Sequence, residues 1–166
     1  MPASSDDRPN PAQLYRALAP AVLGYLRAQR VADAEDVLGE VFLQVARDIR
    51  RFSGDDAAAR RWVFSIAHNR AMDAHRKAAR NRVTLEEALE GKGRATVAPP
   101  PDPLDPALVD ALATLSADQR EVLVLRFVAD LPLEAVAKVT GRRVGAVKAL
   151  QHRALENLRR AVAPEG

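Results

Sequence analysis

Basic and amide side chains alternate with apolar ones near the end of the chain, in a pattern suited to binding nucleic acid. Val144, Val147 and Leu150 recur three residues apart, so on a helix they lie on one buried face. The side chains around them are of the types that bond phosphates and base edges. The candidate DNA-contacting set is Arg142, Arg143, Val144, Gly145, Lys148, Gln151, His152 and Arg153.

The residues just before this set predict how it is positioned. Ala137 has a small side chain, where a second helix can cross closely. Gly141 follows four residues later, where a tight turn with a positive φ costs a glycine least. Small residue, glycine and apolar triplet in this order are typical of a helix-turn-helix, which we expect over residues 131–160.

Two neighbouring stretches of opposite charge precede it. Residues 33–56 hold seven acidic and three basic side chains, whereas residues 60–82 hold seven basic and one acidic. The second stretch predicts a polyanion-binding helix, and the first predicts an acidic surface offered to another partner. Ordinary solvated helix faces are the alternative for both stretches.

Apolar periodicity places these side chains on an all-α scaffold of two small helical domains. We expect a first helix over residues 11–29, which Pro20 either kinks or divides in two. Asp33 should cap the next helix, Asp55 should follow a turn and start a third, and Ser116 with Gln119 should form a capping box. The apolar run 122–125, together with Phe127, should pack a small second core.

The prolines divide the chain into segments. Residues 1–10 are a predicted disordered lead-in, 11–84 a first helical domain, 85–106 a proline-rich linker and 107–163 a helix-turn-helix domain. Such a linker could extend to on the order of 60–70 Å. The predicted fold is therefore a helical bundle tethered to a helix-turn-helix domain.

Composition excludes several classes of protein. The 166 residues contain no cysteine, no apolar run of membrane-spanning length and no apolar signal core, so we expect a cytoplasmic chain without disulfides or membrane insertion. No phosphate-binding glycine loop or nucleophile elbow is present, which argues against an enzyme and against a small-molecule substrate. His68 and His75 share a helix face, but without a cysteine or carboxylate partner they do not predict a metal or other cofactor site.

Three segments in this order resemble bacterial RNA polymerase sigma factors of the extracytoplasmic-function (ECF) type. The segment DAEDVLGEVFLQVARDI (33–49) is similar to that family's polymerase-binding helix. The segment RRWVFSIAHNRAMDAHRKAARNR (60–82) is similar to its helix that melts the minus-ten promoter element. The third, from LSADQREVLVLRFVADLPLEAVAKVTG through VGAVKALQHRALENLRR (115–160), is similar to its domain for the minus-thirty-five element.

The resemblance implies roles for individual residues. Asn69 and Asp73 would lie near the flipped base, and cationic side chains beside them would hold phosphates. The full minus-ten set is Arg61, Trp62, Asn69, Asp73, His75, Arg76, Lys77 and Arg80, although Trp62 is better suited to the hydrophobic core than to stacking on a base. The set expected to bind the clamp coiled coil of the polymerase large subunit is Asp36, Leu38, Glu40, Phe42 and Gln44.

The resemblance also implies partners, namely core RNA polymerase, contacted at the clamp and the flap, promoter DNA and an anti-sigma factor. Arg142 and Arg143 stand where the family usually has an apolar residue and a serine, and Ala146 and Ala149 replace its usual threonine and serine. We expect the two arginines to bind the DNA backbone at the edge of the groove.

Two other functions fit part of the pattern. An ordinary helix-turn-helix regulator would bind a palindrome by itself, whereas a sigma factor would need core polymerase for specific binding. An anti-sigma factor or adaptor would not need two basic helices. The acidic helix and the basic helix before the linker favour the sigma factor.

Overall fold

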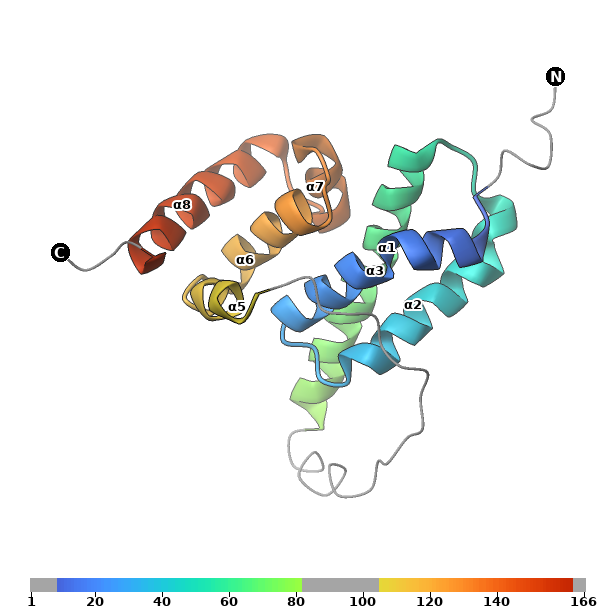
Figure 1. Ribbon diagram of the computed structural model, residues 1–166, viewed down its shortest axis with the longest axis horizontal. Helices are drawn as coiled ribbons and strands as arrows, with labels where there is room; N and C mark the ends of the chain where they lie inside the picture. The colour runs from blue at the N-terminus through green and yellow to red at the C-terminus, as the bar shows by residue number, and fades with distance from the viewer. Residues whose placement is uncertain (1–8, 82–104, 163–166) are drawn as a thin grey trace.

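The first half of the molecule is a bundle of three helices with short connections (Figure 1). The computed structural model describes residues 9–81 and 105–162, and every regular element within these ranges is helical, which confirms the all-α prediction. Residues 1–8 of the predicted lead-in and residues 85–104 of the predicted linker lie outside the described residues. The elements of the first half are α1 (Pro11–Ala28), α2 (Ala34–Asp48), the 3-10 turn η1 (Ile49–Arg51) and α3 (Asp56–Arg80).

The second half contains the expected helix-turn-helix. Its two helices are α7 and α8, and Gly141 between them has a φ of 70°, as predicted for the tight turn. Val147 is fully buried, while Leu150 and Leu158 pack partly against the hydrophobic core. The elements of the second half are α5 (Pro106–Ala113), α6 (Ala117–Leu123), the π-helical turn η2 (Val124–Val128), α7 (Leu133–Thr140) and α8 (Val144–Val162).

Pro20 does not divide the first helix. Residues 11–28 form a single helix, which begins with a side-chain cap from Asn10 to the backbone N–H of Ala12 at 2.9 Å. Leu18, Val22 and Leu23 are buried on either side of the proline. Their burial stabilises the helix more than the missing proline N–H destabilises it.

Two of the three predicted helix caps are confirmed. Asp55 accepts a hydrogen bond from the N–H of Ala58 at 2.9 Å, and Ser116 and Gln119 bond reciprocally at 3.2 and 3.4 Å. Asp33 occupies the N-cap position of α2, as predicted, but its side chain makes no capping bond. Its φ of 56° is left-handed, whereas a capping side chain requires an extended backbone.

Phe127 does not join the hydrophobic core, contrary to prediction. Its side chain is 58% exposed, and the guanidinium of Arg126 lies 5.4 Å from the ring centroid. The cause is the π-helical turn, in which the N–H of Ala129 bonds to the carbonyl of Val124 at 3.0 Å. This wider turn shifts the helical register, so that Ala129 is buried and Phe127 points outward.

The two halves pack against each other rather than standing apart. Helix α3 lies against α7, and α1 contacts α5, α6 and η2. The buried apolar side chains of both halves belong to one continuous cluster. The structure therefore places the two predicted domains in direct contact.

The turn between α7 and α8 gives a first prediction. Replacing Gly141 by alanine should lower the free energy of unfolding by about 1–2 kcal/mol, because an L-residue is strained at positive φ. A Cβ at this position would meet nothing within 4 Å, so the cost should come from the backbone alone. Urea unfolding followed by circular dichroism would measure it.

Gly145→Ala is the matched control, since a Cβ there also meets nothing within 4 Å, but this residue lies inside α8. Alanine favours a helix over glycine by up to about 1 kcal/mol, so this variant should be neutral or stabilised. Equal destabilisation of both variants would contradict the assigned role of Gly141.

Candidate nucleic-acid interface

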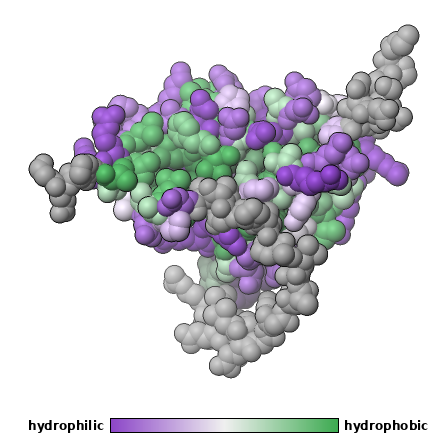
Figure 2. All heavy atoms as spheres, viewed as in Figure 1, coloured by the Kyte–Doolittle hydropathy of each residue, from purple (hydrophilic) through white to green (hydrophobic). Residues whose placement is uncertain are grey.

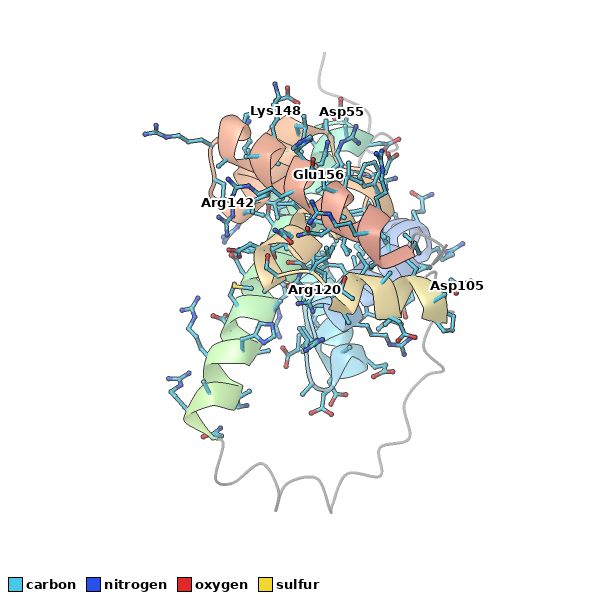
Figure 3. The ribbon with its side chains drawn as sticks, turned by 90° about the vertical axis from the view of Figure 1, so that its left-hand side faces the viewer. Asp55, Asp105, Arg120, Arg142, Lys148 and Glu156 are labelled. Atoms are coloured by element: carbon cyan, nitrogen blue, oxygen red, sulfur yellow. The ribbon has the colours of Figure 1, made fainter. Side chains whose placement is uncertain are left out.

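Helix α8 presents a basic face to solvent. Arg143 precedes the helix, and its carbonyl accepts the first helical hydrogen bond from Val147 at 3.1 Å. Burial of Val147 turns the opposite side of α8 outward. Figure 3 shows Lys148 reaching away from the body of the molecule. The exposed members of the predicted minus-thirty-five set are Arg143, Gly145, Lys148, His152 and Arg153.

The remaining members of this set are only partly accessible. Arg142, in the turn between α7 and α8, donates to Asp118 of α6 at 2.8 Å, so this arginine links the turn to α6. Gln151 is half-buried, with its Oε1 atom buried and without a hydrogen-bond partner among the described residues. Val144 packs partly against the hydrophobic core. The half-buried Gln151 corrects the expectation that this side chain points outward, whereas the partial burial of Val144 agrees with its place on the predicted buried face.

Helix α3 carries the second basic face. The polar residues predicted to share one side of it are exposed together, and Asp73 and Arg76 lie 3.7 Å apart. Arg61 and His75 are half-buried. The exposed members of the predicted minus-ten set are Asn69, Asp73, Arg76, Lys77 and Arg80. Amide, carboxylate and cationic groups on one face could bind an unstacked base and its phosphates.

Trp62 lies at the boundary of the hydrophobic core. Its ring stacks on Phe52 with centroids 4.9 Å apart and an interplanar angle of 15°. The indole is half-buried and packs against the core cluster. This contact agrees with the preference for a core role over a free stacking platform.

Helix α2 presents the acidic face. Glu40 is exposed, and its carboxylate lies 3.8 Å from the guanidinium of Arg70 on α3. Arg70 also donates twice to Oε1 of Gln44, at 3.0 and 3.3 Å. Asp36, one turn before Glu40, is half-buried. The face therefore holds polar groups that are already engaged with α3.

Leu38 and Phe42 cannot supply the apolar part of this surface. They are 4% and 9% exposed and belong to the core, where Phe42 meets Tyr15 edge-on at 5.0 Å. Leu43 is 58% exposed and lies beside Gln44. The predicted apolar patch was therefore wrong. The exposed apolar side chain is Leu43, which lies about a quarter turn of helix from the buried Phe42.

A buried polar triad joins the two halves, and the sequence analysis missed it. The Tyr25 hydroxyl of α1 donates to Oε2 of Glu121 on α6 at 2.6 Å, and Nδ1 of His68 on α3 lies 3.0 Å from the same oxygen. The tyrosine oxygen and Nδ1 are 3.3 Å apart. An ionised carboxylate only accepts, so Nδ1 carries the hydrogen. The available signal was an acid directly before an apolar run, since Glu121 precedes Val122–Leu125.

These contacts perturb the acidity of two members. Burial alone would raise the pKa of Glu121, but hydrogen bonds from His68 and Tyr25 and the charges of His68 and Arg142 outweigh it, so the pKa is lowered from its usual 4.5. Burial, the charge of Glu121 and the hydrogen bond to it raise the pKa of the Tyr25 phenol well above 10.0. The ionised carboxylate and the neutral phenol are therefore the forms that the triad favours.

Comparison with known proteins matches both halves. The family model for sigma-70 region 2 matches residues 14–81, and that for sigma-70 region 4 matches residues 111–160. The ECF RNA polymerase sigma factor SigD of Mycobacterium tuberculosis is 31% identical, over 99% of this chain and 82% of its own length. The chain belongs to the ECF sigma factors.

Other relatives agree with this assignment. The ECF sigma factor BldN of Streptomyces coelicolor is 37% identical over 82% of this chain and 53% of its own length. The fold is similar to that of the sigma factor RpoE from Bartonella quintana, solved in complex with the anti-sigma factor NepR. That match has a TM-score of 0.70 and 23% identity, and covers 93% of this chain and 98% of the other.

Sigma factors are transcription initiation factors rather than catalytic enzymes. Among the described residues of this sigma factor, no group of three or more histidine, cysteine or carboxylate side chains could hold a metal ion. No helix within the described ranges is long and apolar enough to cross a membrane.

The lowered pKa of Glu121 gives a second prediction. Its ionised form contributes stability that is fully present above its usual pKa of 4.5 and is lost as the pH falls through the lower folded-state pKa. At pH 7, Glu121→Gln should lower the free energy of unfolding by about 1.5–3 kcal/mol, because bonds to a charged group are lost. This difference should shrink as the pH falls towards 3.

Chemical unfolding of both proteins between pH 7 and pH 3 would measure the difference. The control is Glu156→Gln, which removes an exposed carboxylate 3.4 Å from His152. A constant difference between wild type and Glu121→Gln at all pH values would show that the carboxylate is not ionised in the folded protein.

Proposed function

We propose that this protein is an alternative sigma factor that binds core RNA polymerase and directs it to a set of promoters. Helix α2 would dock on the clamp coiled coil of the large subunit, α3 would open the minus-ten element, and α8 would bind the minus-thirty-five major groove. The observation that carries the proposal is that two exposed basic helix faces and one acidic face occur within the region 2 and region 4 matches.

The chemistry of each face supports its proposed partner. The exposed cations and amide of α3 suit a single strand, whose bases are accessible only after melting. The exposed Lys148, His152 and Arg153 lie on one helix, the element that enters a major groove. Glu40, with the exposed Leu43 beside it, offers the mixture of charge and apolar surface that basic partner helices bind.

We also propose an anti-sigma factor as a partner. The structure of the sigma factor RpoE from Bartonella quintana is a complex with such a protein. In the present chain, large apolar side chains are exposed along the second half, and Figure 2 shows an apolar area there. Apart from Phe127, these side chains are Leu108 and Val109 of α5 and Leu155 and Val162 of α8. An amphipathic segment of the partner could cover them.

Transcription in vitro from a promoter library would test the proposed function. With core polymerase, the protein should produce start sites that share two upstream motifs at a fixed spacing. Core polymerase alone should produce none of these starts. If no new starts occur while the protein alone binds a palindrome tightly, it is an ordinary helix-turn-helix regulator instead.

Arg143 gives a prediction about the minus-thirty-five contact. Arg143→Ser should keep or raise the thermal midpoint, because serine caps a helix and removes a cation from its positive end. Binding of the holoenzyme to its promoter should weaken. The slope of log affinity against log salt concentration should fall in magnitude by about 1, the amount expected for the loss of one phosphate contact. Fluorescence anisotropy at several salt concentrations would measure both quantities.

The matched control is Arg159→Ser, at an exposed position in the last turn of the same helix. It should leave the salt slope unchanged. Unaltered promoter binding by Arg143→Ser would refute a phosphate contact for Arg143.

A further inference from the structure

The junction between the two halves is stabilised by polar groups at three places. The first is the triad of Tyr25, His68 and Glu121, in which Tyr25 is fully buried and Glu121 is 5% exposed. Its three members come from three helices, two in the first half and one in the second. A carboxylate with two donors from the opposite half is a charge-assisted contact, the stronger kind of hydrogen bond.

Two arginines cross the junction in opposite directions. Arg120 of α6 donates to the carbonyl of Ala28 at the end of α1, at 3.3 Å, and Figure 3 places it where the halves meet. Arg60 of α3 donates to the carbonyl of Ala129, at 3.1 Å. Burial, and to a smaller extent the charge of Arg30, lower the pKa of Arg120. Each half therefore supplies donors to the other.

This closed arrangement does not fit simultaneous binding of two promoter elements. Elements at minus ten and minus thirty-five lie about 25 base pairs apart, which is about 85 Å along B-form DNA, since one turn of 10–10.5 base pairs spans about 34–36 Å. A compact chain of 166 residues is about 40 Å across. The 23 residues between the described halves could bridge at most about 80 Å. The chain is therefore long enough to reach both elements, but only after the two halves separate.

We propose that the Tyr25–His68–Glu121 triad is an intramolecular latch that keeps the free sigma factor closed and must open before both promoter elements are bound. The inhibitory effect of the latch rests on the proposed function, whereas the closed arrangement of the two halves does not. The latch acts within one chain and requires no second protein. It lowers the fraction of molecules that can bind polymerase and DNA productively.

The chemistry of the triad suits a contact that opens reversibly. A carboxylate, a phenol and an imidazole all bond to water when they separate, so the open form leaves no polar group unsatisfied. In the closed form the same groups would be costly without one another. Removing one member should therefore shift the equilibrium toward the open form, where water satisfies the remaining two.

Distance measurements on the full chain test the latch without polymerase. The chain contains no cysteine, so spin labels can be attached to Ala57→Cys on α3 and Ala161→Cys on α8, both exposed positions. The labelled parent should give one narrow distance distribution. Glu121→Ala and Tyr25→Phe should each give longer and broader distributions, with unchanged helical circular dichroism.

Asp118→Ala is the matched control. It removes a carboxylate from the same helix, but Asp118 pairs with Arg142 inside the second half, so its distribution should match that of the parent. If Glu121→Ala unfolds, Tyr25→Phe alone tests the latch. This variant removes only the hydroxyl and keeps the ring, whose centroid lies 6.0 Å from that of Phe64. Unchanged distances in both latch variants, or a broad distribution in the parent, would overturn the latch.

Affinity for core RNA polymerase tests the inhibitory role separately. Opened variants should bind about tenfold more tightly, because a larger fraction is competent to bind. An opened chain with unchanged affinity would overturn inhibition by the latch. A chain with no affinity at all would refute the proposed function, while the distance measurements would still decide whether the latch exists.

Discussion

A nearly fully buried carboxylate constrains how the helices of this protein meet. Glu121 is 5% exposed, and a charge at such a position requires hydrogen bonds and counter-charge to remain ionised. The donors come from α1 and α3, so α6 contacts both of these helices through one carboxylate. Together with the continuous apolar cluster and the two arginine contacts, this side chain fixes how the helix-turn-helix half sits on the three-helix bundle.

Sequence reasoning succeeded where a feature depends on a few neighbouring residues. The capping box at Ser116, the cap at Asp55 and the turn at Gly141 are local, and each follows from side-chain or backbone preferences. The outward face of α3 could also be predicted, because helical spacing alone defines it. Membership of the ECF sigma factors followed from the order of three such segments.

Features that depend on packing between distant segments could not be predicted in this way. Periodicity placed Leu38 and Phe42 on the apolar stripe of their helix, but only the packing of α1 onto α2 shows that neither is left exposed for a partner. The register shift that exposes Phe127 arises from one π-helical turn without a sequence signature. The sequence suggested His68 only as a metal ligand without partners. Its role in the triad could not be predicted, because the residues it contacts lie 43 and 53 positions away in the chain.

Arg70 connects the acidic face of α2 to the helix that carries Asn69 and Asp73, through its contacts with Glu40 and Gln44. A partner that takes these two side chains would release the Arg70 guanidinium beside the proposed DNA strand. Binding free energies are reciprocal, so DNA that holds Arg70 would in turn free the Glu40 carboxylate for the proposed polymerase contact. The two macromolecules would then bind cooperatively through a single shared cation, without any rearrangement of the backbone.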